Sequence, residues 1–310
     1  MSESVRTAIG KLVDRQELPR SEMENVFDDI LSGNCDPVSI AGFLTALRMK
    51  GETVDDITAG ASAMRKHAHR VEALDDVVDT CGTGGLNWTT LNTSTASAIV
   101  VAAAGGRVAK HGNRSVPPKT GSADVLEALG VNLTPTPQQF QKCLAEARVA
   151  FMFAQAHHSA MKHVAPVRKT LGIRTIFNLL GPLTNPASAK RQVLGVFSTD
   201  WVEPLAQVLL RLGAQHAYVV HGNDGMDEIT ISDTTTAAYV TPNGVERLQI
   251  DPLDYGIPRY SRYDIEGGSV DHNAAAIRRL LAGAPGAFRD IVTLNAGAAL
   301  HVSDKTSSIN

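Results

Sequence analysis

The chain has 310 residues, 43% of them hydrophobic and 20% charged, with a formal net charge of −3 at pH 7. This size can bury one large core or two smaller ones. The near-neutral charge, with no basic tail, argues against a nucleic-acid partner, because phosphate backbones are bound through clustered lysines and arginines.

The termini and cysteines indicate where the protein works. The N-terminus has no signal-peptide pattern, and no apolar run is long enough to span a bilayer, so no membrane partner is expected. Cys35, Cys81 and Cys143 are widely spaced and follow no metal-ligand pattern, as is usual for reduced intracellular proteins. We therefore expect a cytoplasmic protein.

Residues 1–70 have the spacing of short amphipathic helices. Val5, Ile9 and Leu12 share one helical face, and residues 37–51 form another helical segment that ends at a glycine. Because no strand pattern interrupts them, a small all-helical domain is predicted here.

From about Glu72 onward, short apolar strands alternate with helical segments. The predicted strands are 77–79, 107–111, 149–153, 192–198 and 216–222, and the predicted helices begin near Ser94, Ser122, Pro137 and Trp201. The Gly- and Pro-rich stretch 242–258 is expected to be a hairpin or loop. This alternation predicts an α/β domain with a central, mostly parallel sheet and helical crossovers.

The most informative stretch runs from Asp79 to Asp124. A strand leads into a turn with three glycines at 82–85, where backbone amides can approach an anion closely. Hydroxyl and amide side chains at 92–95 then begin a helix, and its N-terminus also favours an anion. The next strand delivers Lys110, His111 and Arg114 into a loop expected to carry two fixed cations. A glycine turn alone is weak evidence, but this succession indicates phosphate.

An acidic pair follows the apolar strand 216–220. In isolation, Asp227 and Glu228 would more often be a solvated turn. Their position after a strand, inside HGNDGMDE, favours a functional role, and carboxylates are ligands that magnesium prefers.

These segments, in this order, resemble the anthranilate phosphoribosyltransferase family. The matching motifs are GTGG at 82–85, NTST at 92–95, VAKHGNRSV at 108–116, GSADVLEALG at 121–130, GIRTIFNLLGPLTNPA at 172–187 and HGNDGMDE at 221–228. The resemblance implies transfer of the phosphoribosyl group from 5-phosphoribosyl 1-pyrophosphate to anthranilate, with Mg²⁺ as cofactor, in tryptophan biosynthesis. It also implies a helical domain at 1–70 completed by about 164–183, an α/β domain over the rest of 71–310, and a homodimer.

The resemblance further implies roles for individual residues. Donor binding falls on Gly82, Thr83, Gly85, Thr90, Asn92, Thr93, Ser94, Thr95, Lys110, Asn113, Arg114, Ser115 and Ser122. Anthranilate binding falls on Gly82, Asn113 and Arg168, and magnesium binding on Ser94, Asp227 and Glu228. No dedicated catalytic residue is expected. Lys110 and His111 would act through positioning and electrostatics, because displacement at an anomeric carbon passes through an oxocarbenium-like state.

The chain also departs from the family pattern. Leu86 and Asn87 stand where an Asp-Gly pair usually follows the glycine turn, and residues 117–118 are prolines in place of two serines, which removes two backbone donors. Gln155 and Ser159 stand where prolines are expected. Two alternatives follow: an enzyme of the same fold with another acceptor, suggested by Gln155 and Ser159, or a binding protein without turnover, suggested by Leu86, Pro117 and Pro118.

Overall fold

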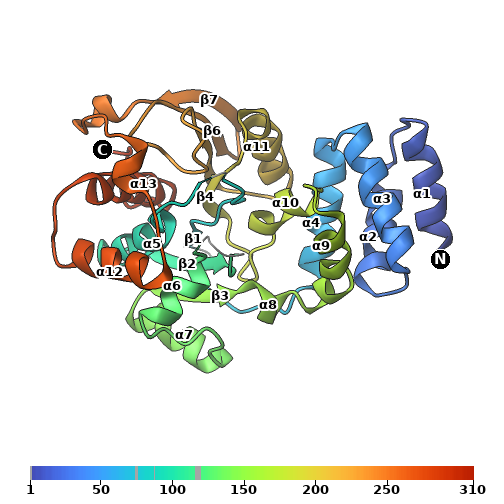
Figure 1. Cartoon of the computed structure of the whole chain (residues 1–310), viewed down its shortest axis with the longest axis horizontal. Coiled ribbons are helices and arrows are strands. Elements are labelled where there is room, and N and C mark those ends of the chain that lie inside the picture. Colours follow the sequence, from blue (N-terminus) through green and yellow to red (C-terminus); the bar gives the residue numbers. More distant parts are fainter. Residues whose placement is uncertain (1, 74–75, 87, 116–119) are drawn as a thin grey trace. The chain divides into compact units, whose positions relative to one another are not determined.

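The computed structural model describes residues 2–73, 76–86, 88–115 and 120–310 (Figure 1). The chain divides into two compact units, one made of Met1–Arg70 and Gln155–Pro186 and the other of Val71–Ala154 and Ala187–Asn310. Across the described ranges, none of the helices combines the length and the apolar character needed to cross a membrane.

The first unit is helical, as the sequence predicts. Its N-terminal helices are α1 (Glu3–Val13), α2 (Arg20–Leu31), α3 (Pro37–Lys50) and α4 (Val54–His67). The segment that returns to it contains α8 (Ala154–His157), η1 (Ser159–His163), α9 (Ala165–Leu171), α10 (Phe177–Leu180) and η2 (Gly181–Leu183). This segment, Gln155–Pro186, is wider than the expected 164–183.

Local signals explain where these helices begin and end. Asp36 caps α3 by accepting a hydrogen bond from the Ser39 amide at 3.0 Å, and Gly51, with φ of 95°, ends the helix. Phe27 forms the centre of the core, with ring centroids 5.8 Å from Phe43 and 5.9 Å from Phe177. The helical unit therefore closes its core with a residue from the returning segment.

The second unit contains a seven-stranded sheet in the order β3-β2-β1-β4-β5-β6-β7 (Figure 1). Its strands are β1 (Val77–Asp79), β2 (Arg107–Gly112), β3 (Val149–Phe153), β4 (Arg191–Gly195), β5 (His216–Gly222), β6 (Thr235–Thr241) and β7 (Gly244–Ile250). The first five are parallel, and β6 and β7 continue the sheet as antiparallel strands. The mostly parallel sheet is confirmed. The stretch 242–258 supplies the second strand of a hairpin and then the short helix η4 (Pro252–Tyr255).

Helices cover the sheet and complete the core. They are α5 (Thr93–Ala103), α6 (Ser122–Ala128), α7 (Pro137–Glu146), α11 (Val202–Arg211), α12 (Val270–Leu281) and α13 (Ala287–Val302), with the short η3 (Thr199–Trp201) and η5 (Arg262–Ile265). Val78 and Val108 pack with apolar residues of α5 and α13 in one cluster, while Val77 and Ala109 pack against α7 in another. Successive residues of β1 and β2 thus face opposite layers, as strand geometry requires.

The strand order by itself predicts where a ligand site lies. The chain moves from β1 to β2 in one direction along the sheet and from β4 to β5 in the other, so the strand order reverses between β1 and β4. Parallel sheets bind ligands at the carboxyl ends of the strands beside such a reversal.

Candidate active site

A pocket of about 230 Å³ lies in the α/β unit at this edge of the sheet. Its walls are the turn after β1, the start of α5, the end of β2 and the acidic pair after β5. Of the residues expected to bind the donor or magnesium, the lining includes Gly82, Thr83, Gly85, Thr90, Asn92, Ser94, Thr95, Lys110, Asn113, Ser115, Ser122, Asp227 and Glu228. Segments that are far apart in the sequence therefore meet here.

The glycine turn is shaped by close contact with neighbouring loops. A Cβ atom at Gly82 would lie 3.0 Å from Asp227 Oδ2, and Gly84 and Gly85 have φ of 65° and 89°. The Gly84 amide donates a 2.7 Å hydrogen bond to Asp227 Oδ2. The turn was expected to offer its amides to an anion, but this amide is already used to hold the acidic pair.

The N-terminus of α5 is capped from a distant part of the chain. The helix begins at Thr93, as predicted, but the Asn92 side chain makes no cap. Its Nδ2 donates to the Thr120 carbonyl at 3.0 Å, and its Oδ1 accepts from Asn273 Nδ2 at 2.9 Å. Glu228 Oε1 instead accepts the Ser94 amide at 2.9 Å, which places a carboxylate where the helix dipole favours negative charge.

Lys110 is a buried cation with neutral partners. It lies within β2 and is 3% exposed, so the expected basic loop in fact begins inside the strand. Its Nζ donates to the Thr80 carbonyl at 3.1 Å, to Thr80 Oγ1 at 3.2 Å and to Ser94 Oγ at 3.3 Å. Within the described part of the chain, no carboxylate forms an ion pair with it. Burying a charge without an ion-pair partner is costly, and an anionic ligand beside Nζ would offset that cost.

Arg114 and Thr93 were expected to bind the donor, but the structure does not bring them into the pocket lining. Arg114 is bound by two neighbouring acids: Nη1 donates to Asp124 and Glu127 at 2.9 Å each, and Nη2 to Glu127 at 2.9 Å. These hydrogen bonds, which Glu127 and Asp124 accept, raise the pKa of the guanidinium. Thr93 is fully buried at the start of α5.

Glu228 has the properties of a metal ligand. Burial, together with the neighbouring carboxylate of Asp227, raises the pKa of Glu228 to about 7. Its Oε2 is buried and accepts no hydrogen bond from any described residue. Glu228 Oε2 is a hard oxygen donor and lies beside Asp227 and the Ser94 hydroxyl. This set of oxygen atoms fits the ligand preference of magnesium.

Asp79, Cys81 and His111 form a cluster that their spacing in the sequence did not reveal. Their ligand-type atoms lie within 4.8 Å of one another, because β1 and β2 are neighbouring strands. Asp79 Oδ1 accepts the His111 amide at 3.1 Å. Burial raises the pKa of the Cys81 thiol, which keeps it protonated at neutral pH.

Several lining residues lie outside the recognised motifs. Thr89 and Thr120 hold the pocket wall by donating to the carbonyls of Gly267 at 3.0 Å and Gly268 at 2.9 Å. No local sequence pattern connects partners so distant along the chain. Leu86 and Trp88 also line the pocket, and the Arg262 guanidinium lies 5.9 Å from the Trp88 ring centroid. Asn87, Pro117 and Pro118 lie outside the described residues.

Arg168 belongs to the helical unit. It lies on α9, with its guanidinium 5.7 Å from the Phe177 ring centroid, and burial lowers its pKa. No carboxylate of the described residues forms an ion pair with it. Its role towards anthranilate stays a prediction.

Known proteins resemble the chain over its full length. The glycosyl transferase family, a/b domain, matches residues 74–310, and the helical bundle domain of the same family matches residues 6–68. The anthranilate phosphoribosyltransferase of Hyphomonas neptunium is 54% identical over 310 residues, which is 100% of this chain and 91% of that protein. That of Parvibaculum lavamentivorans is 51% identical over 98% of this chain and 89% of its own length.

Solved structures agree in fold. The anthranilate phosphoribosyltransferase of Thermus thermophilus superimposes with a TM-score of 0.91 at 43% identity, covering 97% of this chain and 91% of that one. The Saccharomyces cerevisiae enzyme in complex with PRPP and Mg gives a TM-score of 0.89 at 26% identity, covering 99% and 91%. The chain therefore belongs to the anthranilate phosphoribosyltransferase family.

Proposed function

We propose that the chain transfers the phosphoribosyl group of 5-phosphoribosyl 1-pyrophosphate to anthranilate and releases pyrophosphate, a step of tryptophan biosynthesis. The relatives at 51% and 54% identity are named for this activity, and yeast structures of the family hold PRPP with Mg or 4-fluoroanthranilate. The observation that carries the proposal in this chain is Lys110, a buried cation with neutral partners that lines the pocket.

The reaction asks the pocket to hold a polyanion and to stabilise its departure. As the bond to the anomeric carbon breaks, negative charge gathers on the leaving pyrophosphate. The Lys110 ammonium is fixed in place before the reaction, so it stabilises that charge without reorganising. The hydroxyls of Ser94, Thr95 and Ser122 and the amide of Asn113 add donors around the same space.

Magnesium fits the acidic side of the pocket. We assign Ser94, Asp227 and Glu228 as the residues that would hold it, because they offer oxygen atoms and Glu228 Oε2 lacks a partner among the described residues. When bound, the ion would offset the repulsion between these carboxylates and the diphosphate. The protein's own part is to hold the two acids in place through the amides of Gly84 and Ser94.

Acceptor binding, assembly and location remain predictions. Gly82, Asn113 and Arg168 are each proposed as anthranilate-binding residues, and the Arg168 guanidinium suits a planar carboxylate. A homodimer is likewise proposed from the family resemblance, and a cytoplasmic location from the cysteine spacing and the absence of a long apolar run.

The test follows product fluorescence with purified protein, both substrates and magnesium. Wild-type protein should show metal-dependent turnover. Lys110→Met should lower kcat/KM by about 100-fold, the usual cost of losing one fixed donor to a developing charge. Lys142→Met is the matched control, because Lys142 is exposed on α7 and should leave kcat/KM unchanged.

Each other outcome contradicts a specific part of the proposal. If PRPP binds in calorimetry but anthranilate gives no product, the acceptor assignment is wrong, and another acceptor or a binding role takes its place. If Lys110→Met matches the wild type, the anion-binding role of Lys110 is wrong.

A further inference from the structure

The acidic pair lies on a loop without regular secondary structure. Residues 223–234 connect β5 to β6, and Asp227 and Glu228 occupy its middle. A loop of this length has many alternative conformations, so the positions of two carboxylates on it must be fixed by other groups. Two side chains that do not line the 230 Å³ pocket hold the loop on either side of the pair.

Asp224 bridges the loop from within. Its Oδ1 accepts the Met226 amide at 3.1 Å, and its Oδ2 accepts the Thr230 hydroxyl at 2.7 Å. Thr230 Oγ1 in turn accepts the Ser232 amide at 3.0 Å. One carboxylate therefore ties the residue just before Asp227 to the second residue after Glu228.

Asn295 holds the same loop from α13. It is 5% exposed, and its Oδ1 accepts the Ile229 amide at 3.1 Å while its Nδ2 donates to the Ile229 carbonyl at 2.8 Å. Both backbone groups of the residue next to Glu228 are thus satisfied by one side chain. A buried amide used in this way permits little rotation of the backbone it holds.

One carboxylate oxygen of each acid is held by a backbone amide. Asp227 Oδ2 accepts the Gly84 amide and Glu228 Oε1 accepts the Ser94 amide, at 2.7 Å and 2.9 Å. With the Met226 amide, the Ile229 backbone and the Thr230 hydroxyl held, and one oxygen of each acid fixed by an amide, the remaining carboxylate oxygens have little freedom. We propose that Asp224 and Asn295 are positioning residues that set the affinity of this site for magnesium and its diphosphate substrate. The inference rests on the proposed function and extends it to residues outside the pocket lining.

Binding of Mn²⁺, used as a probe for magnesium, is measured by electron paramagnetic resonance with PRPP and without anthranilate. Asp224→Ala should weaken Mn²⁺ binding by about tenfold or more, because loss of a contact that positions the loop carrying metal ligands is expected to act as loss of an outer-shell partner does. Asp224→Asn keeps an acceptor for the Met226 amide and should restore most of the affinity. Thr230→Val, which removes only the bridging hydroxyl, should have an intermediate effect and provides a second variant if Asp224→Ala does not fold.

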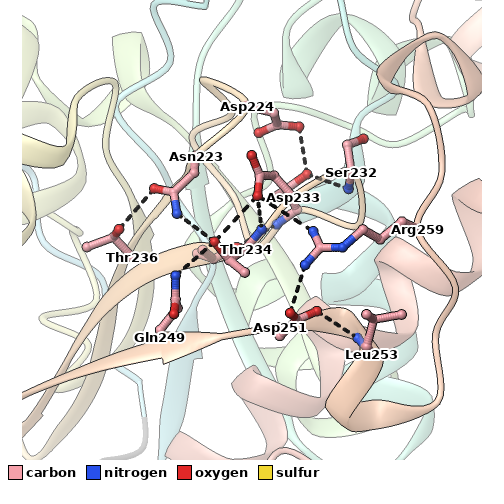
Figure 2. A network of polar contacts seen from close by, with 12 residues as sticks. Asn223, Asp224, Ser232, Asp233, Thr234, Thr236, Gln249, Asp251, Leu253 and Arg259 are labelled. Carbon is pink, nitrogen blue, oxygen red and sulfur yellow. Dashed lines mark hydrogen bonds and ion pairs between the residues drawn. The ribbon is translucent and has the colours of Figure 1, made fainter.

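Asp233→Ala is the matched control. Asp233 lies on the same loop and in the same network (Figure 2), where it accepts the Thr234 amide at 2.7 Å and lies 3.6 Å from Arg259. It does not bridge the acidic pair, so this substitution should lower resistance to urea and leave Mn²⁺ affinity unchanged.

Wild-type affinity in both Asp224→Ala and Thr230→Val, or an equal loss in Asp233→Ala, would overturn the positioning role while leaving the proposed function intact. Failure of the wild type to bind Mn²⁺ with PRPP would overturn the magnesium assignment and the inference with it.

Discussion

Glu228 is subject to two opposing effects at the scale of a single residue. Its Oε1 caps α5, which favours the carboxylate form, but burial and the charge of Asp227 raise its pKa to about 7. A proton and a divalent cation therefore compete for the same group near neutral pH.

The affinity for magnesium should therefore decrease as the pH is lowered through the range in which Glu228 becomes protonated. Between about pH 8 and pH 6, Glu228 passes from mostly ionised to mostly protonated, and the apparent dissociation constant should rise about tenfold for one competing proton. Calorimetric titration of Mg²⁺ in the presence of PRPP at about pH 6, 7 and 8 measures this competition.

Glu228→Gln separates the protein's titration from that of the substrate. The variant should bind Mg²⁺ weakly at every pH, with only the pH dependence that PRPP itself contributes. Its stability gives an independent check. Between pH 4.5, the ordinary pKa of the group, and about pH 7, Glu228 is protonated in the folded protein but ionised in the unfolded chain. The free energy of unfolding therefore falls as the pH rises through that window. An equal fall in the variant would contradict the assignment.

Single residues also show where sequence reasoning about the site succeeded and where it failed. Lys110, Ser94, Asp227 and Glu228 line the pocket as expected, because motifs that end strands or begin helices are placed together by a parallel sheet. Arg114 lies outside the pocket lining, because its partners, Asp124 and Glu127, become its neighbours only when α6 folds. The sequence shows a cation but not the acids that neutralise it.

At the scale of elements, β-branched runs correctly predicted β1 to β5. Strand β6, with the sequence TTAAYVT, was not recognised, because small residues that pack between β5 and β7 give no strong alternation. The capping of α5 was also misjudged. The capping group is Glu228, which accepts the Ser94 amide from 134 residues further along the chain, although Asn92 stands directly before the helix. Long-range hydrogen bonds of this kind are not visible in local patterns.

Gly195, at the end of β4, packs closely against the backbone of the loop that carries Asp227 and Glu228. A Cβ atom at Gly195 would overlap the Asp227 carbonyl oxygen, so one of the two backbone segments would have to move. Gly195→Ala should therefore displace the loop, weaken Mg²⁺ and PRPP binding by about tenfold or more, and cost about 1–3 kcal/mol in the free energy of unfolding. Calorimetry and urea unfolding measure the two effects.

Gly10→Ala is the comparison for this glycine. Gly10 lies within α1 with nothing near its Cβ position, so alanine should raise stability by about 0.5–1 kcal/mol and leave binding unchanged. Normal donor affinity in Gly195→Ala would show that the loop can move without losing its function.

At the scale of the whole molecule, the two units differ in how the chain builds them. The described pocket lies entirely in the α/β unit, whereas the helical unit is assembled from residues 1–70 and a second segment that arrives after β3. Phe177 on α10 is 5% exposed and packs edge-on against Phe27 of α2. The core of the helical unit therefore depends on a contact between two segments that are far apart in the sequence.

Phe177→Ala should weaken the helical unit selectively, by about 3–5 kcal/mol, the usual cost of emptying a buried aromatic site. In native-state hydrogen exchange, amide protection should fall in α2, α3 and α4 and remain high in β2 and β5. Phe140→Ala is the reciprocal variant, because Phe140 on α7 is 2% exposed within the core of the α/β unit, and it should reduce protection in β2 and β3 instead. If Phe177→Ala lowers protection in β5 as much as in α2, the two units unfold as one cooperative structure. A selective loss would mean that the helical unit can open while the pocket of the α/β unit stays folded.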